Sequence, residues 1–381
     1  MELCDGTRTR EQILGTVEPL LEANGPASCK AWLDQAVAQG LLQSGVPAST
    51  REPWTASDLH NLATQLRYQD RVLAAFICQQ RASELAPEDP QQWYALAELS
   101  HIVGRRDEAR AAYERYHQAH PEDVEVQHLL NGLRDEPPPQ RASDQYIEQL
   151  YSGFASFYDD NMCDDLDYRA PDLLNAALRT ALAARDELSV LELGCGTGLF
   201  GQLVRPWARR LVGIDLSAAM VERALQRGIY DSLETAEITA WLARQPSQHY
   251  DVIAICDTLI YFADLRQVLH SAAGHLAPEG ILGFTVEHGT TFPFRLSDSG
   301  RFTHHRDHLF DVAQEAGLPI ISQATEVLRY EYGEAVVGFV TVLGSPHGTR
   351  TAPQRNGTLE SARVATIGRS GDPLAIVSRP L

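Results

Sequence analysis

Three glycines at alternate positions follow a short apolar run near the middle of the chain. Gly194, Gly196 and Gly198 come directly after a run of valine and leucine, and the next apolar run ends on Asp215. This order predicts a buried strand, a tight turn, a helix and a second strand that ends in an acid. Such a unit binds nucleosides, because glycine lets the backbone approach the ligand and the acid accepts hydrogen bonds from ribose hydroxyls.

Two kinds of nucleoside ligand compete for this loop. Residues 196–201 fit the dinucleotide fingerprint G-x-G-x-x-G, and Asp215 lies near the spacing expected for its ribose acid. The loop also has an acid, Glu192, two residues before its first glycine. A carboxylate there suits a ligand with a cationic amino-acid end, whereas a pyrophosphate prefers the free N-terminus of a helix. The pattern E-x-G-x-G-x-G resembles that of the class I S-adenosylmethionine (SAM)-dependent methyltransferases.

That resemblance implies SAM as the cofactor. It assigns cofactor binding to Tyr158, Glu192, Gly194, Gly196, Gly198, Asp215, Leu216, Glu237 and Ile238. Glu192 would face the amino end of SAM, Asp215 would hold the ribose, and Glu237 would contact the adenine amino group. Tyr158 belongs to a segment, 154–162, that would fold over the cofactor as a lid.

Three of these residues also have a purely structural interpretation. Asp215 is a candidate N-cap for a helix that starts at Ser217. Glu237 is a candidate for a solvated helix start, and Tyr158 for a core aromatic at helical spacing from Phe154.

The candidate catalytic residues follow the predicted fourth and fifth strands. Ligands of α/β proteins bind at the carboxyl ends of the strands, which places Asp257 beside the reacting groups. His288, His304 and His305 are candidate general bases at the same edge. Cys256 has no basic neighbour that would lower its pKa, so it is disfavoured as a nucleophile. The loop also lacks the Asn/Asp-Pro-Pro-aromatic and Pro-Cys patterns that mark methyltransferases acting on adenine or cytosine.

Composition excludes several classes of protein. The 381 residues carry a formal net charge of −19, from 51 acids and 32 bases, which disfavours broad binding to nucleic acid. Lys30 is the one lysine, a bias that we interpret as that of a GC-rich bacterial genome. The six cysteines show neither C-x-x-C pairs nor metal spacing with histidine, so we expect no metal site and a cytoplasmic protein with reduced thiols. We also expect no secretory signal and no membrane span.

An internal repeat with a period of 34 precedes the glycine loop. Leu59, Ala63, Ala75 and Pro87 recur as Trp93, Ala97, Ala109 and Pro121. The series resembles tetratricopeptide (TPR) repeats, which are pairs of antiparallel helices, although Tyr116 stands where a small residue is usual. The expected order of domains is a small helical, winged-helix-like segment at 1–52, TPR repeats at 56–134, a proline-rich linker at 135–140, the catalytic domain at 141–343 and a disordered tail at 344–381.

Apolar strands alternate with helices across the predicted catalytic domain, as in a parallel sheet covered on both faces. We expect strands near 188–193, 210–215, 231–236, 250–256, 280–287, 319–329 and 334–343, and helices near 169–184, 198–208, 217–228, 264–276 and 304–316. A hairpin signal at 332–334 closes the pattern. The predicted fold is therefore α/β, a Rossmann-like seven-stranded methyltransferase sheet with a closing antiparallel hairpin, preceded by an all-α TPR module.

The sequence as a whole resembles the predicted TPR-repeat methyltransferases, on the repeat series, Tyr158, residues 168–171, Gly300, Arg301 and His304. This implies methyl transfer from SAM to an unidentified small-molecule or protein acceptor, with the repeats offering a surface for a protein partner. Two alternatives stay open: an NAD(P)-dependent oxidoreductase on the same loop, and a non-catalytic TPR scaffold whose SAM fold is vestigial.

Overall fold

The computed structural model describes residues 54–134, 136–245, 248–331 and 333–346. The predictions for 1–52 and for nearly all of the tail lie outside these ranges. The chain divides into two compact units, with the boundary between Ala119 and His120. Each unit is considered by itself.

In the described part of the first unit, the helices are α3 (Ala56–Tyr68), α4 (Val72–Leu85), α5 (Pro90–Ile102) and α6 (Arg106–Ala119). Thr55 caps α3 through a reciprocal capping box with Asp58, and Asp89 caps α5 directly before Pro90. The alanines of the predicted repeat are buried at 63, 75, 97 and 109, so the paired helices approach closely. Tyr116, the departure from the repeat pattern, packs its ring 5.0 Å from that of Tyr94.

The second unit alternates helices and strands. Its helices are α7 (Val124–Leu133), α8 (Asp144–Phe154), α9 (Tyr158–Asp160), the π-helical turn Asn161–Asp165, α10 (Ala170–Ala181), α11 (Leu199–Val204), α12 (Ala218–Gln226), α13 (Ile238–Arg244), α14 (Arg266–Ala273) and α15 (Arg306–Glu315). Its strands are β1 (Leu188–Leu193), β2 (Ala208–Asp215), β3 (Ser232–Thr235), β4 (Tyr250–Ile255), β5 (Leu276–His288), β6 (Phe294–Leu296), β7 (Phe302–His304), β8 (Ile320–Glu331) and β9 (Glu334–Gly344). Short 3₁₀ turns cover Arg205–Trp207 and Leu259–Tyr261.

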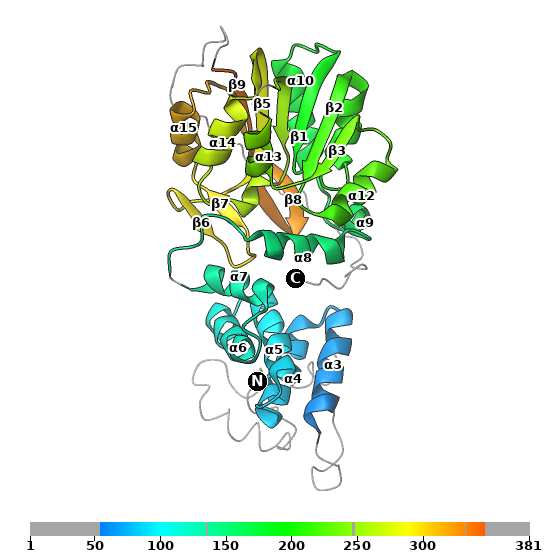
Figure 1. The fold of residues 1–381 in the computed structure, drawn as a ribbon. Coiled ribbons are helices and arrows are strands. Elements are labelled where there is room, and N and C mark those ends of the chain that lie inside the picture. The colour runs from blue at the N-terminus through cyan, green and yellow to red at the C-terminus, as the bar shows by residue number, and fades with distance from the viewer. Residues whose placement is uncertain (1–53, 135, 246–247, 332, 347–381) are drawn as a thin grey trace, which may run out of the picture. The chain divides into compact units, whose positions relative to one another are not determined.

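One sheet holds all nine of these strands (Figure 1). Strands β3, β2, β1, β4 and β5 pair in parallel in that order, and β9 pairs antiparallel with both β5 and β8. This part of the sheet has the seven strands and the closing hairpin that the sequence predicts. The two further strands, β6 and β7, form an antiparallel pair that joins the end of β5 through Thr303 and His304.

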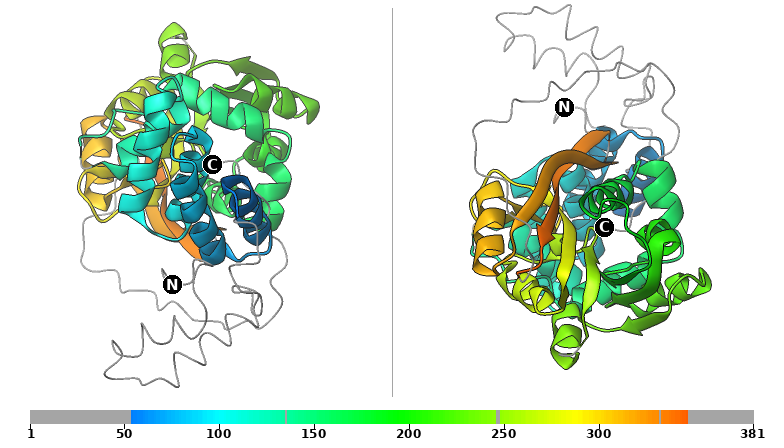
Figure 2. Two further views of the ribbon diagram at one scale, coloured as in Figure 1. Left: turned by 90° about the horizontal axis from the view of Figure 1, so that it is seen from below. Right: turned by 90° about the horizontal axis from the view of Figure 1, so that it is seen from above.

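Apolar side chains alternate between the two faces of the strands, so each face has its own core. Leu191, Ile253 and Phe284 pack with α13, α14 and α15 on one face. Val190, Val252 and Val342 pack with α10 and α11 on the other. Seen from above in Figure 2, α10 lies on the opposite side of the strands from α14 and α15. A parallel sheet covered in this way exposes its ligand-binding edge at the carboxyl ends of the strands.

The boundary between the two units differs from the predicted one. Helix α7, which lies within the range predicted for the TPR repeats, 56–134, belongs to the second unit. There the ring of His128 stacks on Tyr146 of α8, and its Nε2 lies 2.8 Å from the carbonyl oxygen of Gly300. The end of the predicted linker is also tied to this unit, because the amide of Ala263 donates to the carbonyl oxygen of Gln140.

Candidate active site

The glycine loop connects β1 to α11, and all three of its glycines have a positive φ. A Cβ atom on Gly194 would lie 2.0 Å from Oγ1 of Thr258, whereas one on Gly196 would meet no atom within 4 Å. Close packing therefore requires glycine at 194. At 196 the backbone instead faces open space, and that space is part of a cavity.

Asp215, the last residue of β2, holds this loop in place. One oxygen of its carboxylate accepts a hydrogen bond from the amide of Gly196 at 2.8 Å, and the other accepts one from the amide of Ser217 at 2.8 Å. Helix α12 is capped by the hydroxyl of Ser217 and not by Asp215. Burial raises the pKa of Asp215 above its ordinary value, against the effect of these amide donors.

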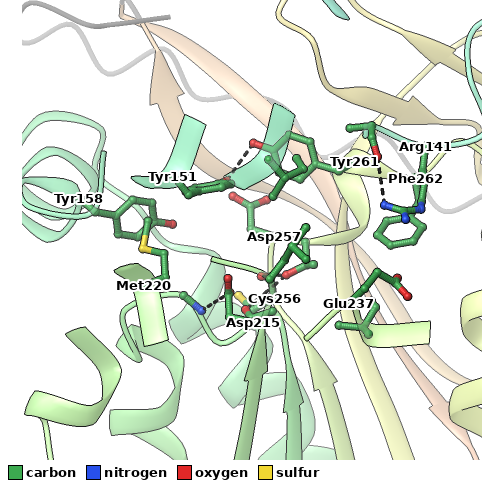
Figure 3. A pocket seen from close by; sticks show the side chains of 17 residues that line it. Arg141, Tyr151, Tyr158, Asp215, Met220, Glu237, Cys256, Asp257, Tyr261 and Phe262 are labelled. Carbon is green, nitrogen blue, oxygen red and sulfur yellow. Dashed lines mark hydrogen bonds between the residues drawn. The ribbon is translucent and has the colours of Figure 1, made fainter. Parts of the chain in front are cut away.

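The loop opens into a first cavity with about 720 Å³ of empty space, a volume that includes open solvent at its mouth. Eight of the predicted site residues line it: Tyr158, Gly194, Gly196, Asp215, Leu216, Glu237, Ile238 and Asp257. In Figure 3, Tyr158 and Met220 lie on one side, Glu237 and Phe262 on the other, and Asp215 and Asp257 between them. The structure thus brings together residues from five separate segments of the chain.

Glu237 has a helix-capping role as well as a place in the cavity. Its Oε2 accepts hydrogen bonds from the amide of Ala240 at 2.7 Å and from the hydroxyl of Thr239 at 2.5 Å, which caps α13. Its Oε1 is buried and has no hydrogen-bond partner among the residues that the structure describes. One oxygen of this acid therefore remains for a ligand.

Glu192 and Gly198 are not among the residues that line the first cavity. Glu192 is 1% exposed, and its carboxylate accepts a hydrogen bond from the hydroxyl of Tyr230 at 2.8 Å. Burial raises its pKa to about 8. Gly198 forms the left-handed N-cap of α11. Cofactor binding by these two residues stays a prediction.

The three histidines predicted as candidate bases lie elsewhere in the fold, and their catalytic role stays a prediction. His304 is fully buried in β7, where its Nε2 lies 2.9 Å from the carbonyl oxygen of Phe262, and burial lowers its pKa to about 4. His288 is exposed at the end of β5, with its ring edge-on to Phe339. His305 caps α15. The helix expected from 304 starts at Arg306, because the residues before it pair as β7. None of these histidines lines the cavity.

Asp257 stands at the carboxyl end of β4 with a φ of +52°. Its Oδ2 accepts a hydrogen bond from Nη1 of Arg329 at 3.0 Å, while its Oδ1 is buried and has no partner within the described part of the chain. Burial raises its pKa, and Arg329 offsets part of that rise. Cys256 is buried beside it, and burial raises the pKa of its thiol well above the usual value. The thiol therefore stays protonated, which agrees with excluding Cys256 as a nucleophile.

Comparison with known proteins identifies the domain around this cavity. Residues 191–282 match the family model of a methyltransferase domain, and residues 90–131 match that of a tetratricopeptide repeat. The chain carries a class I SAM-dependent methyltransferase domain. Its predicted combination with TPR repeats is confirmed, as is the α/β fold class.

Named relatives match only part of this chain. Nodulation protein S of Sinorhizobium fredii is 30% identical over 111 residues, which are 28% of this chain and 51% of that protein. A dTDP-4-amino-2,3,4,6-tetradeoxy-D-glucose N,N-dimethyltransferase of Saccharopolyspora spinosa is 31% identical over 128 residues, 32% of this chain and 49% of that protein. The chain spans about half the length of these two relatives.

Among solved structures, the N-methyltransferase NodS of Bradyrhizobium japonicum WM9, in complex with S-adenosyl-L-homocysteine, aligns with a TM-score of 0.37 and 21% identity. The alignment covers 46% of this chain and 86% of that one. Within the ranges that the structure describes, no helix is long and apolar enough to cross a bilayer.

The sequence does not predict two features of the methyltransferase domain. Tyr151 of α8 and Tyr261 join their hydroxyls at 2.9 Å beside the cavity, in segments for which no site residue is expected. Arg329 lies inside a predicted strand, and Arg301 is noted only for the family resemblance. No local signal marks Arg329, because β8 also contains polar residues such as Gln323 and Glu326, and only the fold shows that its charge is buried and needs a partner.

Proposed function

We propose that this chain transfers a methyl group from SAM to a small-molecule acceptor, with SAM bound in the first cavity. The observation that carries the proposal is the bond between Asp215 and the amide of Gly196 within a matched methyltransferase domain. Because β1 and β2 are neighbouring parallel strands, their carboxyl ends present the glycine loop and the acid to one ligand. A ribose diol would use the lone pairs that remain on the Asp215 carboxylate.

The other residues of the first cavity fit the same cofactor. The unpartnered Oε1 of Glu237 is a hydrogen-bond acceptor and would suit the adenine amino group. Leu216 and Ile238 offer apolar surface to the ring, and Gly196 leaves room for close approach of the backbone. Tyr158, in the segment predicted as a lid, lines the cavity from the side opposite Glu237.

Bound SAM supplies an already activated methyl group on a sulfonium ion. The chain therefore has to orient the acceptor and exclude water, more than to generate a strong nucleophile. Tyr158 and Tyr261 line the cavity together with Asp257. Asp257 is the carboxylate there that is placed to take a proton from an acceptor.

Binding measurements separate this proposal from its alternatives. Isothermal titration should show SAM and S-adenosylhomocysteine (SAH) binding and no binding of NAD. Asp215→Asn should weaken SAH binding about tenfold or more, since hydrogen bonds to a charged group are worth about 1.5–3 kcal/mol each. Asp172→Asn, at an exposed position in α10, is the matched control. NAD binding without SAM binding would establish the oxidoreductase instead.

The scaffold alternative is tested by turnover. Labelled SAM incubated with a cell extract should transfer its methyl group when the full-length protein is added. Tight SAH binding with no transfer to any extract component would favour a non-catalytic role.

We also propose that the repeats bind a protein partner, on the strength of the TPR match alone. A cytoplasmic location is proposed as well, since Cys78, Cys163, Cys195 and Cys256 are free thiols.

A further inference from the structure

A second cavity adjoins the first in the methyltransferase domain. The two share Tyr151, Tyr158, Asp257 and Tyr261 among their lining residues. The second cavity contains about 740 Å³ of empty space and extends from Asp257 towards α8 and the π-helical turn. A molecule held there would therefore lie next to the ligand of the first cavity.

A buried network of ion pairs forms the polar wall of this second cavity. Arg301 donates to Glu287 at 2.7 Å and to Glu331 at 2.6 Å. Arg329 donates to Asp257 at 3.0 Å, to Glu331 at 2.8 Å and to Glu287. All five side chains are at most 15% exposed. Among the residues that the structure describes, two guanidinium groups thus face three carboxylates.

Two buried oxygen atoms at this cavity have no hydrogen-bond partner among the described residues. They are Oδ1 of Asp257 and Oδ1 of Asn161. The amide nitrogen of Asn161 already donates to Asp165 at 3.2 Å, which leaves its oxygen as an acceptor. Both oxygens therefore need a donor, because a buried polar atom without a partner costs about 1–3 kcal/mol.

Apart from Ser299, the rest of the cavity wall is mostly apolar. Leu129, Leu150, Phe154, Met162, Leu166 and Ile260 line it together with the tyrosine rings. A ligand that matches these surfaces has an apolar body and one end that carries N–H or O–H donors.

We propose that the second cavity binds the methyl acceptor, and that this acceptor is an amine with an apolar body whose nitrogen lies at Asp257. The inference rests on the proposed function and names its substrate class. An ammonium ion would be attracted by the three carboxylates of the network and would donate to the unpartnered oxygens. A carboxylate acceptor would be repelled by these carboxylates, and a neutral alcohol would gain less from them than a cation does.

The chemistry balances with the residues present. The amine enters as an ammonium ion and gives one proton to the Asp257 carboxylate. Its lone pair then forms the N–C bond to the methyl carbon, while the C–S bond breaks and its electron pair stays on sulfur. The product leaves as a methylated ammonium ion, and Asp257 returns its proton to solvent. The raised pKa of Asp257 favours proton uptake from an ammonium ion.

Three probes with the same apolar body test the inference by isothermal titration of the full-length protein, with and without saturating SAH. They are 2-phenylethylamine, 2-phenylethanol and 3-phenylpropionate. We expect the amine to bind at least about tenfold more tightly than the alcohol, a factor that corresponds to about 1.4 kcal/mol, and the carboxylate to bind most weakly. With SAM present, mass spectrometry should detect N-methylated 2-phenylethylamine.

Two variants separate the charge from the shape of the cavity. Asp257→Asn should abolish the preference for the amine. Leu150→Trp, which fills the apolar part and changes no charge, should block all three probes and leave SAH binding intact. The control variant Asp172→Asn should bind SAH and all three probes as the wild-type protein does.

The outcomes distinguish this inference from the proposed function. If the wild-type protein bound no SAH, the proposed function would be overturned. SAH binding with no amine binding, or with alcohol or carboxylate bound as tightly as the amine, would overturn the acceptor class alone. A retained amine preference in Asp257→Asn would do the same.

Discussion

The carboxylate of Glu192 is fully buried in the strand that leads into the glycine loop. Its pKa of about 8 lies above the ordinary value of 4.5 because burial penalises the charged form, although the hydroxyl of Tyr230 opposes that rise. Between these two pH values the folded protein holds a proton that the unfolded chain has released. Protonated Glu192 therefore makes its full contribution to the free energy of unfolding below about pH 4.5, and this contribution is lost as the pH rises through about 8.

Replacing Glu192 with glutamine removes this titration and keeps an acceptor for Tyr230. The free energy of unfolding of the wild type, relative to Glu192→Gln, should therefore fall by about 1.4 kcal/mol per pH unit between about pH 5 and 8. Urea denaturation at four pH values in that interval measures the difference. The control is Glu148→Gln, at an exposed position of α8. Its free energy of unfolding should depend on pH as that of the wild type does. If the free energy of unfolding of Glu192→Gln also depended on pH as that of the wild type does, Glu192 would be ionised in the folded protein throughout this pH interval.

At the scale of the element, two glycines of the loop are required for different reasons. A Cβ on Gly194 would clash with Thr258, whereas a Cβ on Gly196 would enter only the first cavity. Gly196→Ala should fold with a cost of about 1–2 kcal/mol from its left-handed backbone and should weaken SAH binding at least about tenfold. Gly194→Ala should lower the melting temperature much further. Calorimetry and SAH titration of both variants check this contrast.

The pair of variants also tests where the cofactor lies. If Gly196→Ala bound SAH as tightly as the wild type, the ligand would not approach the loop at that residue. The Asp215–Gly196 hydrogen bond would then be purely structural.

Elements with strong local signals could be predicted from the sequence, and those set by distant contacts could not. Strand β1 is an unbroken buried run, and its bounds are those predicted, 188–193. Strands β6 and β7 have three residues each, which is too short for a periodic pattern. Their pairing depends on the end of β5, which no local rule can supply. Helix α8 begins after Ser143, whose hydroxyl accepts from the amide of Tyr146, and this capping signal was available in the sequence.

The same distinction holds for the site. Asp215, Glu237 and Asp257 could be predicted because each directly follows or begins an element with a clear signal. Glu192 precedes a glycine in the expected pattern, yet its side chain points away from the cavity towards Tyr230. His304 was assigned to a helix, and the pairing of β7 with β5 buries it instead. The partners of Arg329 come from β4, β5 and its own strand, and only the folded sheet brings them together.

At the scale of the whole molecule, the repeat match and the packing divide the chain at different places. The repeat match runs to residue 131, but the compact units separate between Ala119 and His120. Helix α7 lies close to the turn before β7, since a Cβ on its Gly132 would come within 2.5 Å of the carbonyl oxygen of Ser297. Leu129, Leu130 and Leu133 of this helix are buried.

Two fragments of the chain test whether helix α7 stabilises the methyltransferase domain. A fragment of residues 120–381 keeps α7, and one of residues 141–381, the predicted catalytic domain with its tail, lacks it. The longer fragment should unfold cooperatively and bind SAH as the full chain does. The shorter one should melt several degrees lower, since removing a buried leucine costs about 2–5 kcal/mol and the bond from His128 to Gly300 is also lost. Equal melting temperatures would mean that α7 contributes nothing to the stability of the methyltransferase domain. The domain would then begin at the predicted boundary, residue 141, and not at His120.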